Sequence, residues 1–126
     1  MAAVDILCTM GVGYTLDASG EQTPDCGAGV TAGLVVITIV YDASWAGTLQ
    51  FEAATRRIGA DGTVSVDYDP ITATNTNGGT EDSTTNGTTS EEEIWRVDAS
   101  GFWATRVNCT ARSGGSALVH FNQVMG

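Results

Sequence analysis

The sequence predicts an all-β fold, an antiparallel β-sandwich of about seven to eight strands. Sixteen glycines stand beside only two prolines, which suits many turns between strands. Thr and Val recur in short runs where apolar and polar residues alternate with the period of two that strands require. A long stretch with the 3.6-residue period of an amphipathic helix is not evident.

The chain divides into a Gly-rich N-terminal arm, residues 1–29, and a sandwich domain, residues 30–126. Its 126 residues with 42% apolar content suffice for one well-filled core but not for two. The arm has little reason to fold alone, so we expect it to become ordered on a partner surface.

The first strand of the domain lies in the stretch GLVVITIVYD, and both of its faces are apolar. One face carries Val35, Ile37, Ile39 and Tyr41, and the other carries Leu34, Val36, Thr38 and Val40. Such a strand is either covered on both sides or gives its second face to a subunit interface, because exposing that face would leave an adhesive patch.

The next strands have one apolar face each. Leu49, Phe51 and Ala53 alternate with polar neighbours, which indicates a strand between a core and water. Asp61-Gly62 is a strong hairpin signal and precedes a strand beginning at Val64. A short strand is expected to restart at Ile71.

Residues 75–93 form a long polar loop in this interpretation. Positions 75–90 contain no apolar side chain, and three glutamates follow. Loops of this length are uncommon inside compact domains. The segment is either a solvated loop at one end of the sandwich or an exposed tip that touches a partner.

Three further strands are predicted at residues 94–97, 102–111 and 117–123. A Ser-Gly-Gly-Ser turn separates the last two, which we expect to form a hairpin. Trp45 and Trp95 are expected in the core, with Phe102 beside them. Trp103 shares a face with core positions, yet its place at the start of a strand suits a rim or a subunit contact.

The stretches SWAGTLQFEA and IWRVDASGFWATRVNCTARSGGSALVHF resemble accessory proteins of tailed-bacteriophage virions. The resemblance spans residues 30–124 and has no single invariant signature. It departs from the family where Val64 replaces a usual Trp and where Trp103 replaces a more common polar residue. Proteins of this kind are compact, often jelly-roll-like sandwiches that serve as capsid decoration (cement) proteins or sit at fibre bases.

Charge and hydropathy exclude some partners. Fifteen acidic residues against five arginines and no lysine give a net charge of −10, which repels nucleic acid and anionic lipid. The longest apolar run, residues 32–41, is too short to cross a bilayer. The first residues have no basic start before an apolar stretch, so we expect synthesis in the host cytoplasm.

The three cysteines, Cys8, Cys26 and Cys109, have no metal-binding spacing. We interpret all three as reduced, and a disulfide between Cys8 and Cys26 is the alternative. Cys109 lies on one strand face with Val107 and Ala111, which predicts a place in the core.

The chain offers little for catalysis. It has one histidine, His120, which we interpret as a surface or sheet-edge residue, and no nucleophile or phosphate-binding motif. Asp67 and Asp69 as a glycosidase pair lack a partner of contrasting environment. Acidic residues near loops could bind calcium, but no Asp-x-Asp-x-Asp-Gly pattern is present. We therefore expect no enzyme activity, no cofactor and no metal.

These observations predict a non-enzymatic structural protein of the phage virion, a decoration protein on the capsid exterior that binds the major capsid protein. Capsid decoration proteins commonly sit at three-fold positions, so the resemblance implies a homotrimer, and closed symmetry would also cover the second apolar face of the strand from Leu34 to Val40. The alternative is a carbohydrate-binding or adaptor module at a tail or fibre. Candidate partner contacts are Met10, Tyr14, Leu34, Val36 and Trp103.

Overall fold

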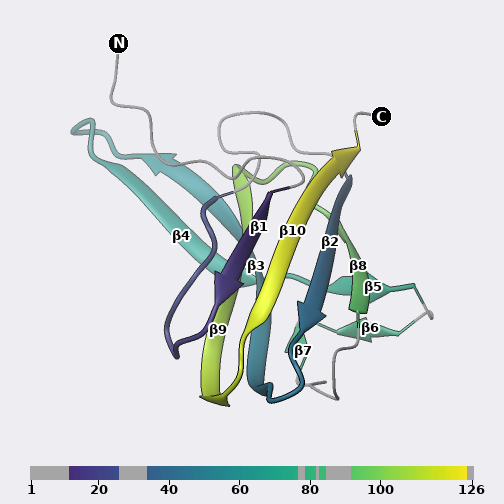
Figure 1. The fold of residues 1–126 in the computed structure, drawn as a ribbon. Coiled ribbons are helices and arrows are strands. Elements are labelled where there is room, and N and C mark those ends of the chain that lie inside the picture. Colours follow the sequence, from purple (N-terminus) through teal and green to yellow (C-terminus); the bar gives the residue numbers. More distant parts are fainter. Residues whose placement is uncertain (1–11, 26–33, 77–78, 82, 85–91, 125–126) are drawn as a thin grey trace.

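The computed structural model describes residues 12–25, 34–76, 79–81, 83–84 and 92–124 (Figure 1). These residues contain ten strands and no helix, which confirms the all-β class. Eight strands have three or more residues: β1 (Gly13–Leu16), β2 (Leu34–Tyr41), β3 (Ala46–Ile58), β4 (Val64–Pro70), β5 (Ala73–Asn75), β8 (Glu92–Asp98), β9 (Ala104–Gly114) and β10 (Ala117–Val124). Two are shorter: β6 (Thr80–Glu81) and β7 (Ser83–Thr84).

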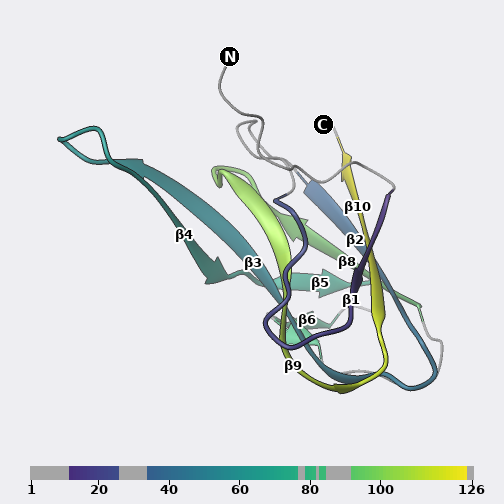
Figure 2. The ribbon, with the colours of Figure 1, turned by 60° about the vertical axis from the view of Figure 1, so that its left-hand side comes forward.

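The strands form two antiparallel sheets that pack face to face, as predicted (Figure 2). The six-stranded sheet has the order β1-β10-β2-β8-β5-β6. In the smaller sheet, β3 is the central strand and pairs with β9 along one edge and with β4 and β7 along the other. β3 is long enough for two strands to share one of its edges: β7 pairs near its start, and β4 pairs with its second half.

Two crossovers join the sheets at the same end of the sandwich. One leads from β2 to β3, and the other leads from β9 to β10. A two-stranded ribbon, β2 with β10, thus continues as β3 with β9 and rolls over the end of the molecule, as in a jelly roll. The predicted hairpin between the last two strands was wrong, because β9 and β10 lie in different sheets.

Asp42 fastens the two crossovers to each other. Its Oδ1 accepts a hydrogen bond from the Ser44 backbone N–H at 2.9 Å, and its Oδ2 accepts from the Ser116 backbone N–H at 3.0 Å. The first of these bonds is the main reason that the pKa of Asp42 lies below its usual value. Gly115 adopts φ 73° at this junction, where a Cβ would collide with the backbone of Ser44 and Trp45.

The core lies between the sheets and takes the alternate residues of each strand. In β2 these are the odd-numbered residues, and in β3 they include Leu49 and Phe51. Trp95 is buried against Phe51 with ring centroids 4.9 Å apart. Trp45 and Cys109 are also buried, as the sequence indicated, whereas Phe102 is only half-buried and lies outside the main core cluster.

The predicted boundary at residue 29 does not separate an arm from the sandwich. β1 pairs with β10, and its Leu16 side chain is 1% exposed in the core. Residues 20–25 then run along the outer edge of β9, where Cys109 and Val107 exchange backbone hydrogen bonds with them. Sequence periodicity missed this part because β1 is only four residues long. Met10, Cys8 and Cys26 lie outside the described residues.

The predicted polar loop, residues 75–93, is partly strand. β6 and β7 fall within it, and β8 already begins at Glu92. Glu93 points to the core side, where its Oε1 accepts hydrogen bonds from Tyr41 Oη at 2.7 Å and Trp95 Nε1 at 3.3 Å. The sequence did not predict that Glu93 accepts these hydrogen bonds, because Glu93 stands in a run of glutamates and the two donors are aromatic core residues.

Candidate interaction surfaces

The outer face of the six-stranded sheet carries an apolar patch. Because strand side chains alternate, the residues of β2, β8 and β10 that do not enter the core all point to this face. We call the following set the outer patch: Leu34, Val36, Val40, Ile94 and Leu118. Leu34 is 38% exposed and the others are half-buried, so the predicted second apolar face of β2 is real.

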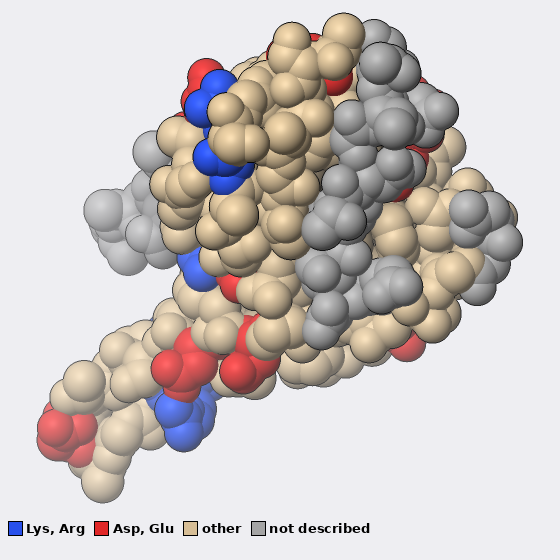
Figure 3. Space-filling view, turned by 90° about the horizontal axis from the view of Figure 1, so that it is seen from below, with Lys and Arg blue, Asp and Glu red and all other residues tan. Residues whose placement is uncertain are grey.

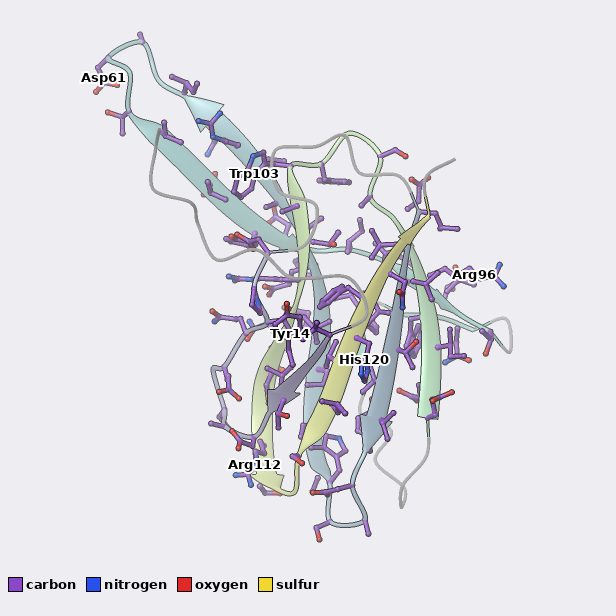
Figure 4. The ribbon with its side chains drawn as sticks, turned by 45° about the horizontal axis from the view of Figure 1, so that its top comes forward. Tyr14, Asp61, Arg96, Trp103, Arg112 and His120 are labelled. Carbon is purple, nitrogen blue, oxygen red and sulfur yellow. The ribbon has the colours of Figure 1, made fainter. Side chains whose placement is uncertain are left out.

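Polar side chains interrupt and border the outer patch. His120 lies at its centre, in register with Thr38 on one side and Gly13 on the other (Figure 4). Its strand, β10, is flanked by β1 and β2, so His120 is a surface residue but not an edge residue. Glu92 and Asp98 are exposed at the two ends of β8, in register with Val40 and Leu34.

The predicted contact residues do not form one surface. Leu34 and Val36 belong to the outer patch. Tyr14 lies on the opposite face of its sheet, in register with buried Val119, and packs against the core cluster. Trp103 is half-buried at the start of β9, and its backbone N–H donates to the Ala54 carbonyl at 2.8 Å (Figure 4).

A polar cluster covers part of the outer face of the smaller sheet. The Glu52 side chain is largely buried, since the residue is only 6% exposed. Its carboxylate accepts from Arg106 Nε at 2.7 Å and from Asn108 Nδ2 at 3.2 Å. The Arg106 guanidinium also lies over the Tyr68 ring, 3.4 Å from its centroid.

Asp25 completes this cluster by accepting a hydrogen bond from Tyr68 Oη at 2.7 Å. Burial is the main reason that the pKa of Tyr68 is raised to about 12, and the hydrogen bond to Asp25 is the second. The cluster therefore joins β3, β4, β9 and the segment after β1. Four of its members come from distant parts of the sequence, which is why no motif pointed to it.

The β3–β4 hairpin is the third surface. Residues 55–66 extend beyond the sandwich, and β4 pairs with β3 alone (Figure 2). Figure 3 shows the hairpin standing clear of the body of the molecule. Gly62 has φ 86° in the turn, and the Asp61 Oδ1 accepts from the Thr63 backbone N–H, which confirms the predicted Asp-Gly turn.

The two faces of the hairpin differ in character. One face pairs Ile58 with Val64 and Arg56 with Val66. Ile58 is 61% exposed and Val64 is 49% exposed, the highest exposures among the large apolar side chains of the described residues. On the other face, Arg57 forms an ion pair with Asp67, and Thr55, Asp67 and Asp69 line a shallow open hollow.

The described residues contain no group of three His, Cys, Asp or Glu side chains placed to bind a metal ion. In the same part of the chain, no helix has the length and apolarity of a transmembrane segment. Sequence reasoning missed the exposed pair Ile58 and Val64, because a two-residue turn at Asp61-Gly62 would pair Ile58 with Ser65, whereas the structure pairs it with Val64.

Comparison with known proteins gives one informative likeness. No protein-family model matches the chain, and no curated protein matches its sequence. Among solved structures, the fold is similar to that of the SPBc2 prophage-derived protein YomS, with a TM-score of 0.58 and 15% sequence identity. The match covers 95% of this chain and 100% of the other, so the whole β-sandwich, and not one motif within it, is shared with a protein of prophage origin.

Proposed function

We propose that this protein is a non-enzymatic structural component of a bacteriophage particle, a decoration protein that binds the major capsid protein on the outer surface of the head. The observation that carries the proposal is the fold shared with a prophage-derived protein over nearly the full length of both chains. The resemblance of the strand sequences to virion accessory proteins supports the same assignment from independent evidence.

The surface properties fit this role. A net charge of −10 disfavours non-specific aggregation before assembly. The outer patch and the β3–β4 hairpin provide apolar contact area on a rigid sandwich, where contacts can be made without folding new structure. In the described residues, titratable side chains form structural pairs such as Glu52 with Arg106, and not a convergent catalytic set.

A carbohydrate-binding module at a tail or fibre is the weaker candidate. It requires an exposed, coplanar platform of aromatic rings. Trp45 and Trp95 are both buried, and the Tyr68 ring is covered by Arg106. Trp103 alone among the three tryptophans retains substantial exposure. An adaptor at the tail shares the fold and is separated from a decoration protein by position in the particle.

The test is the copy number of this chain in purified particles, measured by quantitative mass spectrometry against the major capsid protein. Tail-free heads and purified tails are analysed separately. We expect the chain in heads at a copy number comparable to that of the capsid protein. A number that fits a single vertex, or recovery in tails only, would refute the decoration role, and absence from particles would refute any structural role in the virion.

A further inference from the structure

The β3–β4 hairpin exposes apolar side chains that no described strand covers. A two-stranded hairpin without a third strand or a packed face is marginally stable in water. Residues 55–66 nevertheless present Ile58, Val64 and Val66 on one face, with no described strand against them. This arrangement is expected of a segment that packs on something outside the chain.

The charge of the hairpin selects the kind of partner. Arg57, on the other face of the hairpin, is paired with Asp67, so residues 55–67 have no net charge, whereas the whole chain carries −10. Arg56 shares the apolar face of the hairpin, and it makes no ion pair within the described residues. The apolar face of the hairpin therefore carries one positive charge that the described residues do not pair, which is complementary to the acidic body of another copy.

The outer patch is the surface on that copy which matches best. It is apolar, and β8 contributes the exposed carboxylates of Glu92 and Asp98 at its two ends, with Arg96 between them in register with Val36. The hairpin extends about 15–20 Å beyond the sandwich at roughly 3.3 Å per residue, while β10, β2 and β8 span about 10 Å at 4.8 Å per strand spacing. One hairpin is therefore long enough to lie across all three strands.

The same chain cannot make this contact with itself. The apolar face of the hairpin continues the outer face of the smaller sheet, and the outer patch belongs to the opposite side of the sandwich. We propose that the hairpin of one copy packs on the outer patch of a second copy, with Ile58 and Val64 against the patch and Arg56 near Glu92 or Asp98. Such a contact joins two different surfaces, so it closes either as a reciprocal dimer, in which each hairpin packs on the other copy, or as a ring such as a trimer.

The contact is tested on the purified chain, independently of its place in a virion. Sedimentation is measured from low to high micromolar concentration for the native chain, for Ile58→Glu and for Ser65→Glu. Ser65 lies on the other hairpin face, so Ser65→Glu adds the same charge without touching the contact. We expect the native chain and Ser65→Glu to form the same closed oligomer, and Ile58→Glu to be monomeric but folded, with the circular dichroism spectrum of the native chain.

A mixing experiment identifies the receiving surface. Leu34→Glu spoils the outer patch at a position that is already partly exposed, so it leaves the core intact. Leu34→Glu alone should be monomeric. In an equal mixture of the two variants, Leu34→Glu supplies an unchanged hairpin and Ile58→Glu supplies an unchanged outer patch. The mixture should therefore form a heterodimer. A native chain that stays monomeric at every concentration, an Ile58→Glu variant that still assembles, or a mixture that does not associate would each overturn the proposal.

Discussion

Arg106 shows how one side chain can hold several elements in place. It neutralises the buried carboxylate of Glu52 and at the same time covers the ring of Tyr68. Burying a carboxylate is costly unless it is paired and hydrogen-bonded, and Asn108 supplies the second donor. The base of the β3–β4 hairpin is thereby attached to β9. This attachment fixes the direction in which the hairpin leaves the sandwich.

Tyr68 makes the same cluster sensitive to alkaline pH. Its pKa is raised from 10.0 to about 12 in the fold, so the folded state favours the neutral phenol. The stability from this preference is complete below pH 10 and is lost as the pH rises towards 12. The chain has no lysine, so few other groups titrate there. We expect thermal stability to fall across this range, and to fall less in Tyr68→Phe.

The direct measurement is the tyrosinate absorbance of both proteins during an alkaline titration. The difference between the native and Tyr68→Phe curves isolates Tyr68. A midpoint near 12 agrees with the structure, and a midpoint near 10 would show that burial and Asp25 do not hold the phenol neutral.

At the scale of the elements, the hairpin and the sandwich are expected to be separable. Arg57 and Ser65 are direct partners across the hairpin, two residues before the hydrogen-bonded pair Gly59 and Thr63, so an Asn-Gly turn can join them in place of residues 58–64. The removed side chains are exposed. We expect the free energy of unfolding, measured in denaturant, to change by less than about 1 kcal/mol.

A core variant calibrates that experiment. Phe51→Ala removes a fully buried ring that contacts Trp95, and should cost about 3–5 kcal/mol. If the shortened hairpin lost a comparable amount, the hairpin would belong to the folding unit and would not be an independent projection.

The elements also show what periodicity can and cannot predict. The odd-numbered core residues of β2 and the turn at Asp61-Gly62 were predictable, because alternation and turn chemistry are local. The sheet change between β9 and β10 was not, since a short Gly-rich turn suits a hairpin and a crossover equally well. What decides here is Asp42, which is 74 residues from its partner Ser116.

At the scale of the whole molecule, β1 is expected to be essential although the sequence placed it in an arm. Leu16 is fully enclosed between the sheets, so Leu16→Ala should cost about 2–5 kcal/mol of unfolding free energy. Thr15 is its matched control, because it is exposed on the opposite face of the same strand, and Thr15→Ala should change stability by about 0.5 kcal/mol or less.

Equal effects of the two substitutions would contradict the place of β1 in the sandwich. Chemical denaturation followed by Trp fluorescence measures both, since Trp45 and Trp95 are buried in the same core.

Only some of the candidate surfaces could be predicted from the sequence. The outer patch follows from the two apolar faces of β2, whereas the polar cluster is formed only in the tertiary fold.

The position of β10 between β1 and β2 constrains the order in which the protein folds. This strand stands between β1 and β2, so the last strand of the six-stranded sheet to be synthesised is the one that joins β1 to the rest of the sheet. Until residue 124 has left the ribosome, β1 has no strand to pair with and β2 lacks one of its two neighbours. Contacts between distant residues form slowly. The six-stranded sheet therefore closes only after β10 has been made, and until then the nascent chain carries exposed β-strand edges that a chaperone can hold.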